Sequence, residues 1–346
     1  MQHSRPHPRA AFEGYYNKFT LPSGATVLII ISKVHDAPSQ GDSVSLTYVP
    51  ASEKEPYHRQ HWPESLQYLD NDPPGGFTLL APDGSARAAF HVNKTVYDIH
   101  LPDLDFTATT GPPLPWSRTA PAILNTPASW LANLPLPLQW HVHSLGSSTD
   151  FTLRLSSSAT LPPEEDQAGE AIVHQEKNWA HSFPSAHVWI QARRGTKGIC
   201  LAGGQTLGMD AFLLGYRDDD ANTEVNMQPP FALGVRFLGL SPFMSHTVDW
   251  SRRRFEMTVQ SLTQKVVVRA HAPKGTFFAL AAPFSEGHRD NWLGQSMKAT
   301  VEVSIFHRPW WVLGAWQRSV QDTFEGAALE FGGEYYGARG TAQTRN

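Results

Sequence analysis

The sequence predicts an all-β protein built from two domains, and three observations support this prediction. The chain has 346 residues, which suits two domains of ordinary size better than one. Its 27 prolines and 26 glycines are spread along the whole length and divide the chain into short segments. These segments are rich in β-branched and aromatic residues with period-two alternation, which is typical of strands. Many short strands separated by turns indicate sandwiches or barrels rather than alternating strands and helices.

The individual elements follow from this alternation. In the first half, strands are predicted at 25–33, 43–49, 86–92, 95–101, 138–145 and 151–155. The second half continues with strands at 171–174, 187–192, 198–202, 211–216, 254–260, 265–271 and 298–307. Helical patterns are scarce, with modest candidates at 128–133 and 316–324.

A domain boundary is predicted where the alternation is interrupted. The stretch 156–169 is polar, acidic and contains two prolines, which is typical of an exposed loop or linker. We therefore expect an N-terminal β domain over 1–165 and a C-terminal β domain over 166–346. A ligand pocket is expected at or near the interface of two such domains.

Composition and charge narrow the classes of function. The net charge of -4 and the pI near 6.5 argue against a nucleic-acid partner, which normally needs a basic face. The longest aliphatic run, 27–31, is far shorter than the roughly 20 residues that cross a bilayer, so we expect no stable membrane insertion. The single cysteine, Cys200, excludes an internal disulfide. Together with the lack of a secretory signal, it predicts a cytoplasmic protein.

Sixteen histidines raise the question of a metal site. His141 and His143 flank Val142, so on a strand both side chains would face the same side. A metal needs a third and usually a fourth ligand, and nothing nearby in the sequence supplies them. The glycine-rich stretch 203–208 lacks the lysine and the helix of a phosphate-binding loop. We therefore predict neither a metal nor a cofactor.

Two clusters concentrate side chains that could carry chemistry. The first reads Phe12-Glu-Gly-Tyr-Tyr-Asn-Lys18, an aromatic pair between a carboxylate and an ammonium group. The second reads Glu176-Lys-Asn-Trp-Ala-His-Ser-Phe-Pro-Ser-Ala-His-Val-Trp-Ile-Gln191. Ordinary structural roles remain open for both. The first is compatible with an edge strand that has a bulge at Gly14, and the second with a surface Glu–Lys pair and two core tryptophans.

Taken in this order, the two clusters resemble the tocopherol cyclase family. The family's opening is approximately Phe-Glu-Gly-Trp-Tyr-x-Lys, and its central signature is approximately Glu-Lys-Asn-Trp-Gly-x-x-Phe-Pro-x-x-Trp-x-Trp-x-Gln. The C-terminal part is similar as well, over 280–283, 299–305 and 327–333. In this chain Tyr15 and His187 replace family tryptophans and Ala180 replaces a glycine, which indicates a pocket reshaped for a different substrate. Plant-type tocopherol formation is therefore not implied.

The resemblance implies a lipocalin-like architecture of two β-barrel or β-sandwich domains packed side by side. This architecture is shared with carotenoid hydratases and decalin-forming pericyclases. The resemblance also implies a cofactor-free enzyme of specialised metabolism. Its substrate would be an apolar prenylated or quinone-methide-type molecule on which an oxygen heterocycle is closed.

Two routes to ring closure stay open. Either an acid protonates an alkene and a phenol oxygen captures the cation, or a pericyclic closure occurs in which the protein supplies shape and orientation. The alternative function is a lipocalin-like carrier that binds an apolar metabolite without transforming it. The sequence also leaves a homodimer open.

The resemblance assigns site roles residue by residue. Glu176 is the candidate acid and Glu13 the second choice, while Lys177 and Asn178 would hold the oxygen end of the substrate. Aromatic walls could stabilise a carbocation by about 1–2 kcal/mol each. The residues expected to line the substrate are Phe12, Tyr15, Lys18, Trp179, Phe183, His187, Trp189 and Gln191.

Overall fold

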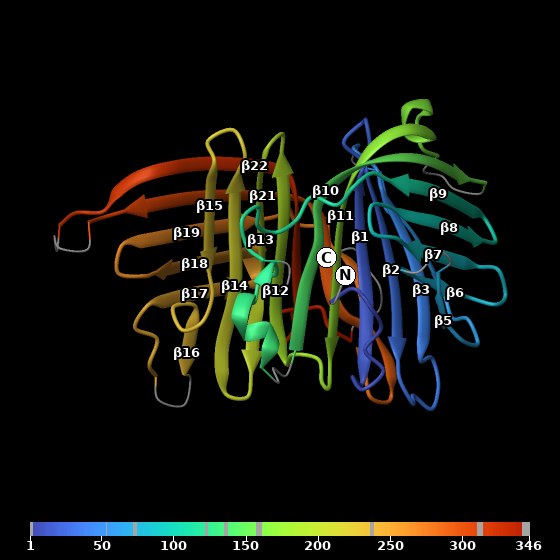
Figure 1. Cartoon of the computed structure of the whole chain (residues 1–346), viewed down its shortest axis with the longest axis horizontal. Coiled ribbons are helices and arrows are strands. Elements are labelled where there is room, and N and C mark those ends of the chain that lie inside the picture. The colour runs from blue at the N-terminus through green and yellow to red at the C-terminus, as the bar shows by residue number, and fades with distance from the viewer. Residues whose placement is uncertain are drawn as a thin grey trace. The chain divides into compact units, whose positions relative to one another are not determined.

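The structure, a computed structural model, describes residues 3–52, 54–71, 75–121, 124–134, 138–156, 161–235, 239–309 and 314–340. It confirms the predicted all-β class, because the described chain consists mainly of strands in two 11-stranded sheets (Figure 1). Helical structure in these residues is limited to 3-10 turns such as Ser129–Asn133, Glu164–Asp166 and Trp250–Arg252.

The first sheet is antiparallel, with the strand order β4-β3-β2-β1-β11-β10-β9-β8-β7-β6-β5. Its strands are β1 (Phe12–Thr20), β2 (Thr26–Val34), β3 (Asp42–Val49), β4 (Tyr57–His61), β5 (Gln67–Asp70), β6 (Phe77–Leu80), β7 (Ala86–Phe90), β8 (Thr95–Leu101), β9 (Leu104–Thr110), β10 (Leu138–Leu155) and β11 (Ala168–Ala180).

The connection between β4 and β5 requires this sheet to curl. The two strands are the opposite edges of the sheet, yet only residues 62–66 join them. Eleven strands laid flat would hold their edges about 48 Å apart. The short link spans at most about 21 Å. The sheet therefore closes toward a half-barrel. A hydrogen bond of 3.0 Å from Lys33 Nζ to the Leu66 carbonyl oxygen ties the link to β2.

The concave inner face of this sheet holds the first hydrophobic core. Alternate residues of each strand point inward, as Tyr15 and Phe19 do on β1 and Val173 does on β11. Phe19 meets Tyr97 and Phe106 edge to face, with ring centroids 5.4 and 5.0 Å apart. Side chains from both halves of the strand order thus meet inside the curl.

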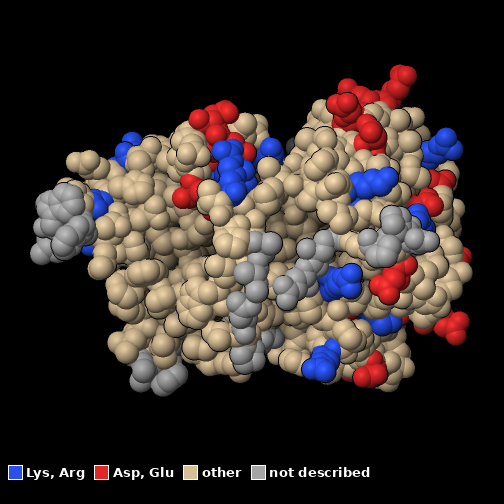
Figure 2. Space-filling view, viewed as in Figure 1, with Lys and Arg blue, Asp and Glu red and all other residues tan. Residues whose placement is uncertain are grey.

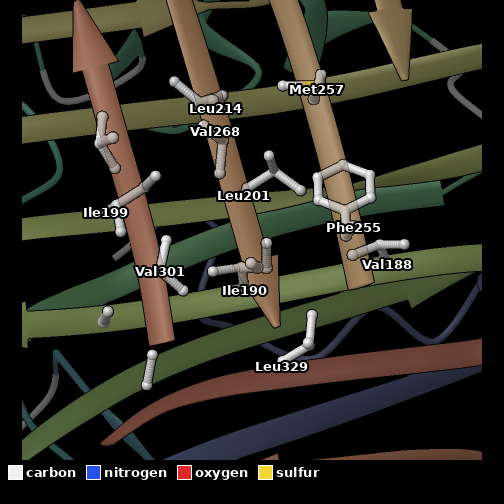
Figure 3. Close-up of a cluster of buried hydrophobic side chains, with 14 of the residues drawn as sticks. Val188, Ile190, Ile199, Leu201, Leu214, Phe255, Met257, Val268, Val301 and Leu329 are labelled. Carbon is white, nitrogen blue, oxygen red and sulfur yellow. The ribbon is translucent and has the colours of Figure 1, made fainter. Parts of the chain in front are cut away.

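The second sheet has the order β15-β14-β13-β12-β22-β21-β19-β18-β17, with β16 paired to β14 and β20 to β21. Its strands are β12 (Ala186–Arg194), β13 (Lys197–Thr206), β14 (Met209–Asp218), β15 (Thr223–Met227), β16 (Leu233–Val235), β17 (Met244–Asp249), β18 (Arg254–Gln260), β19 (Gln264–His271), β20 (Phe278–Phe284), β21 (Gly287–His307) and β22 (Gln317–Gly333). Its inner face carries an aliphatic core in which Val188, Ile190 and Leu201 lie with Phe255 and Met257 (Figure 3).

The helix expected at 316–324 is wrong, because this segment forms the first part of β22. Val320 pairs with Ile305 and Phe324 with Val301 across β21. Pairing with a long neighbouring strand therefore overrides the weak helical pattern of a polar segment.

The chain divides into two compact units. The first comprises Met1–Phe183 and Pro283–His288, and the second comprises Pro184–Ala282 and Arg289–Asn346. The division after Phe183 differs from the boundary expected after residue 165, because β11 pairs with β1 on one side and β10 on the other. The described residues of the polar stretch, 156 and 161–169, thus lie within the first unit, and the last two already belong to β11, while residues 157–160 lie outside the described residues.

The surface carries charges of both signs. On the face shown in Figure 2, basic and acidic side chains lie interspersed among uncharged residues. Among the described residues, no helix has the length and apolar character needed to span a membrane.

Candidate functional site

The antiparallel pair of β1 and β11 brings the two sequence clusters together. Glu13 lies opposite Trp179, and Tyr15 lies opposite Lys177. Because side chains alternate along a strand, these four residues project to the inner face of the first sheet, the face of the hydrophobic core. Glu176 projects to the outer face. The two sequence neighbours Glu176 and Lys177 are therefore separated by the sheet.

A buried ion pair is the centre of the inner-face cluster. Lys177 Nζ lies 2.6 Å from Glu13 Oε2, and both side chains are 0% exposed. The Tyr68 hydroxyl donates a hydrogen bond of 2.5 Å to Glu13 Oε1, and His35 Nε2 lies 3.3 Å from the same oxygen. Both carboxylate oxygens of Glu13 are thus close to polar groups from three other segments of the first unit.

The surroundings favour the ionised form of this pair. Burial alone would raise the pKa of Glu13, but its contacts with His35, His7 and Lys177 outweigh burial and hold the pKa well below its usual range. Burial lowers the pKa of Lys177 to about 8, against the opposing effect of the Glu13 charge. At neutral pH the site therefore holds a carboxylate and an ammonium group.

The leading segment, residues 3–10, lies over the ion pair. Besides Glu13, Lys177 Nζ contacts the Arg5 carbonyl oxygen at 2.5 Å, His7 Nδ1 at 2.9 Å and the Tyr15 hydroxyl at 2.9 Å. The backbone N–H of His7 donates to Glu13 Oε2 at 2.9 Å. This segment therefore contacts both charged groups of the pair.

Aromatic rings border the ion pair on the same face. The His7 ring stacks on Trp179 with centroids 3.9 Å apart and an interplanar angle of 7°. Lys177 Nζ lies 4.6 Å from the Tyr15 ring centroid and 5.6 Å from that of Trp179, within the range of cation–π attraction. A charged donor next to an aromatic wall could activate and orient a conjugated ligand.

Two histidines of β10 complete this face. His141 lies opposite Lys177, and its ring centroid is 4.7 Å from that of His143, so the prediction that both face the same side is confirmed. Burial lowers the pKa of His141 to about 3 and that of His143 well below its usual range. Both imidazoles are therefore neutral at physiological pH. Within the described part of the chain, no group of three metal-ligating side chains is placed to hold a metal.

The outer face of the same strands carries another set of predicted residues. Glu176 Oε2 lies 2.9 Å from His174 Nε2, and both side chains are buried. Asn178 lies on this face beside Gly14. A Cβ at Gly14 would lie only 2.9 Å from Asn178 Oδ1, so glycine permits the close approach. The candidate acid and Asn178 are thus away from Lys177.

The remaining predicted residues of the first unit also lie on the outer side. Phe12 packs against Phe183, with ring centroids 5.6 Å apart. Lys18 shares the strand face of Phe12 by alternation and is buried.

The predicted residues His187, Trp189 and Gln191 belong to the second unit. They alternate on β12 with core residues and therefore face away from the core of that unit. His187 Nε2 lies 2.7 Å from Glu330 Oε1, and Gln295 Nε2 donates to Glu330 Oε2 at 3.0 Å. His187, Glu330 and Gln295 thus form a separate buried polar cluster.

Sequence reasoning missed three contributors to the inner-face cluster. His7, His35 and Tyr68 all contact the ion pair, but they lie on three separate segments. Tyr68 reaches Glu13 only because the sheet curls, and no local pattern signals that. For His7, the proximity of Pro6-His-Pro8 to the first motif is the only hint in the sequence. The catalytic and substrate roles of the twelve residues named from the sequence stay predictions.

Comparison with known proteins adds evidence on the fold. No family model and no curated protein matches the sequence. Two solved structures of CghA are similar. One has a TM-score of 0.59 and 10% identity over 96% of this chain and 94% of that chain. The other, CghA with Sch210972, has a TM-score of 0.53 and 10% identity over 93% and 88%. Kievitone hydratase from Nectria haematococca has a TM-score of 0.53 and 9% identity over 97% and 93%.

The similarity to these structures extends over nearly the whole chain, although only 9–10% of the residues are identical. At this level of identity, it is evidence for the fold alone. The resemblance to tocopherol cyclases rests on the quoted motifs and stays a prediction. The chain thus has the two-sheet, lipocalin-like fold of CghA and kievitone hydratase.

Proposed function

We propose that the chain is a non-redox, cofactor-independent enzyme of specialised metabolism that closes an oxygen heterocycle on an apolar substrate. The reaction would occur on the inner face of the first unit, at Lys177, Glu13 and Trp179. The observation that carries this proposal is the fully buried Lys177–Glu13 pair beside an aromatic wall. Removing two charges from water costs several kcal/mol per ion, and such perturbed pairs cluster at functional sites.

The ionisation states favour the pericyclic route. Because Glu13 is held as a carboxylate, it lacks the proton that alkene protonation requires. Lys177 is protonated at neutral pH and can donate a hydrogen bond to a carbonyl oxygen of the substrate, which polarises the conjugated system. When the conjugated carbonyl system of the substrate closes on an alkene, one C–O and one C–C bond form from π electrons. No atom is gained or lost, and Lys177 keeps its proton.

The other residues of the cluster would position the reactants. Glu13 holds the ammonium group of Lys177 in place, and the Tyr68 hydroxyl holds Glu13. The Trp179 face would orient the conjugated part of the substrate. Holding two reacting groups in a near-attack pose can lower the activation free energy by roughly 7–11 kcal/mol.

Glu176 remains the candidate for the protonation route. It lies on the outer face with His174, so this route would use a different place from Lys177.

The names of the similar structures support small-molecule chemistry in general: one is a hydratase, and another was solved with Sch210972.

The test is mass spectrometry of metabolite extracts incubated with the full-length protein. Cyclisation predicts that one feature disappears while an isomer of the same mass appears. In D2O, pericyclic closure adds no deuterium to carbon, whereas alkene protonation adds one. A gain of water would identify a hydratase, and retention of a compound without change would support the carrier.

Variants assign the reaction to a place in the fold. We expect Lys177→Met to lower turnover by at least about 100-fold, as for the loss of a donor to a developing charge. Glu170→Gln, an exposed change on the same strand β11, should leave turnover unchanged. If Glu176→Gln abolishes turnover and Lys177→Met does not, the reaction site assigned here is wrong.

A further inference from the structure

We propose that the His7 imidazole occupies the ring-binding position of this site, and that the ligand is a neutral, planar conjugated ring with an oxygen acceptor, which displaces His7. The inference rests on the proposed function for the location of the site, and it adds the class of ligand. The leading segment, residues 3–10, would then be an internal stand-in for the substrate.

The geometry of His7 defines what a ligand must supply. The ring lies parallel to Trp179, with centroids 3.9 Å apart and an interplanar angle of 7°, the face-to-face arrangement of two flat π systems. At the edge of this ring, His7 Nδ1 lies 2.9 Å from Lys177 Nζ. A ligand that takes this position needs a flat π face for Trp179 and an acceptor atom at its edge for Lys177.

The contacts of the neighbouring backbone extend this description. The Arg5 carbonyl oxygen accepts from Lys177 at 2.5 Å, and the Ser4 carbonyl oxygen accepts from the Tyr15 hydroxyl at 3.2 Å. When the leading segment leaves, these two donors, Lys177 and Tyr15, need new acceptors, because an unpaired buried donor costs about 1–3 kcal/mol. A carbonyl or phenol-type oxygen supplies them.

The charge balance indicates a neutral ligand. The Glu13 carboxylate and the Lys177 ammonium group already compensate each other, so a charged ligand would be left without a partner. The internal occupant agrees with this, since burial lowers the pKa of His7 and keeps its ring neutral at physiological pH.

The leading segment is built so that it can be exchanged. Its residues lie outside the strands of both sheets, and β1 begins only at Phe12. Its contacts with the pair are made by the His7 side chain, the His7 N–H and the Arg5 carbonyl oxygen. His3 and Ser4 add contacts with Trp179, His141 and Tyr15. None of these contacts is a strand pairing, so exchanging the segment for a ligand leaves the sheet register unchanged.

The experiment measures binding of chromone, a planar ring with a conjugated carbonyl, to the full-length protein by isothermal titration calorimetry. The saturated ketone 1-decalone is the non-planar comparison. His7→Ala removes the internal ring, so chromone should bind at least about tenfold more tightly than to wild type, because the competing closed state is lost. His181→Ala, a change at an exposed histidine, should leave the affinity at the wild-type value.

Two further variants test the stacking position itself. His7→Phe keeps a flat ring over Trp179 without the acceptor, and should bind chromone no better than wild type. Trp179→Leu in the His7→Ala background should remove the gain in chromone affinity. Equal chromone affinity in wild type and His7→Ala, or an equal gain for 1-decalone, would overturn the proposal. Circular dichroism identifies any unfolded variant, in which case His7→Ser replaces His7→Ala.

These outcomes are separate from those for the proposed function. If chromone binding responds to His7 as expected but no metabolite is converted, the ligand site stands and the catalytic proposal fails. If Lys177→Met abolishes turnover while His7→Ala leaves chromone binding unchanged, catalysis stands and His7 is a structural residue.

Discussion

At the residue scale, one step along β11 decides what a side chain can do. Lys177 points to the inner face and meets Glu13, while its neighbour Glu176 points to the outer face and meets His174. Both are buried, yet only the first pair lies beside Trp179. A motif that reads as one catalytic run in the sequence is therefore divided between two environments.

The buried pair makes a direct prediction for stability. Glu13→Gln leaves the Lys177 ammonium group buried without its counter-ion, and we expect a loss of about 3–5 kcal/mol in the free energy of unfolding of the first unit. Urea denaturation followed by near-UV circular dichroism measures the loss.

The matched control is Glu170→Gln on the exposed part of β11, which should change stability by less than about 0.5 kcal/mol. Glu13→Gln combined with Lys177→Met should recover most of the loss, because no unpaired charge remains. Additive losses in the double variant would show that the two charges do not act as a pair.

The pKa of Lys177 predicts the pH dependence of turnover. The protonated ammonium group is the active form, so kcat/KM should fall as the pH rises through about 8. Lys177→Arg keeps its charge over this range, so its residual kcat/KM should stay level between about pH 7 and 10. A fall near pH 8 that persists in Lys177→Arg would assign the titration to another group.

At the element scale, the strands were predictable where their pattern is local. The sequence pattern located β2, β3 and β8 closely. In the structure only β8 alternates buried with more exposed residues, whereas all eight residues of β3 are buried. The segment 316–324 was not predictable, since its strand form depends on pairing with β21. The inner-face cluster was only partly predictable. The register of β1 with β11 links the two motifs, but the contribution of Tyr68 from β5 depends on the curl of the whole sheet.

The pairing of β12 with β22 contains a position that excludes a larger residue. Gly332 lies opposite His187, and a Cβ at Gly332 would lie 1.8 Å from the His187 ring. Gly332→Ala should therefore expel this ring, break its contact with Glu330 and cost about 1–3 kcal/mol in thermal-denaturation experiments. In a His187→Ala background the same change should cost much less, and an equal cost in both backgrounds would contradict the steric explanation.

At the scale of the whole molecule, the first unit is discontinuous in sequence. Pro283–His288 returns to it from the middle of the second unit's chain. Within the first unit, His288 Nε2 lies 2.9 Å from Ser32 Oγ, and its Nδ1 lies 2.8 Å from the Gln40 carbonyl oxygen. Neither unit therefore corresponds to one uninterrupted stretch, and no boundary predicted from local composition can separate them.

This return predicts a remote effect on β2. His288→Ala removes both hydrogen bonds and should cost about 1–2 kcal/mol locally. Amide hydrogen exchange followed by mass spectrometry should be faster in peptides covering residues 26–42 of this variant. His307→Ala, a change at an exposed histidine of the same strand, should leave those peptides at the wild-type rate. Unchanged exchange in His288→Ala would show that the returning segment does not stabilise β2.

The link of residues 62–66 also limits how far apart the two edge strands of the first half-barrel can lie, and so limits its width. Because it joins the two edge strands, each residue added there would let the edges move apart by up to about 3.5 Å. Tyr68, the second residue of β5, lies just beyond the link and would move away from Glu13 as the interior widens. Insertions and deletions in this one loop would therefore offer evolution a simple way to resize the interior for bulkier or slimmer ligands, while every strand pairing of the sheet stays intact.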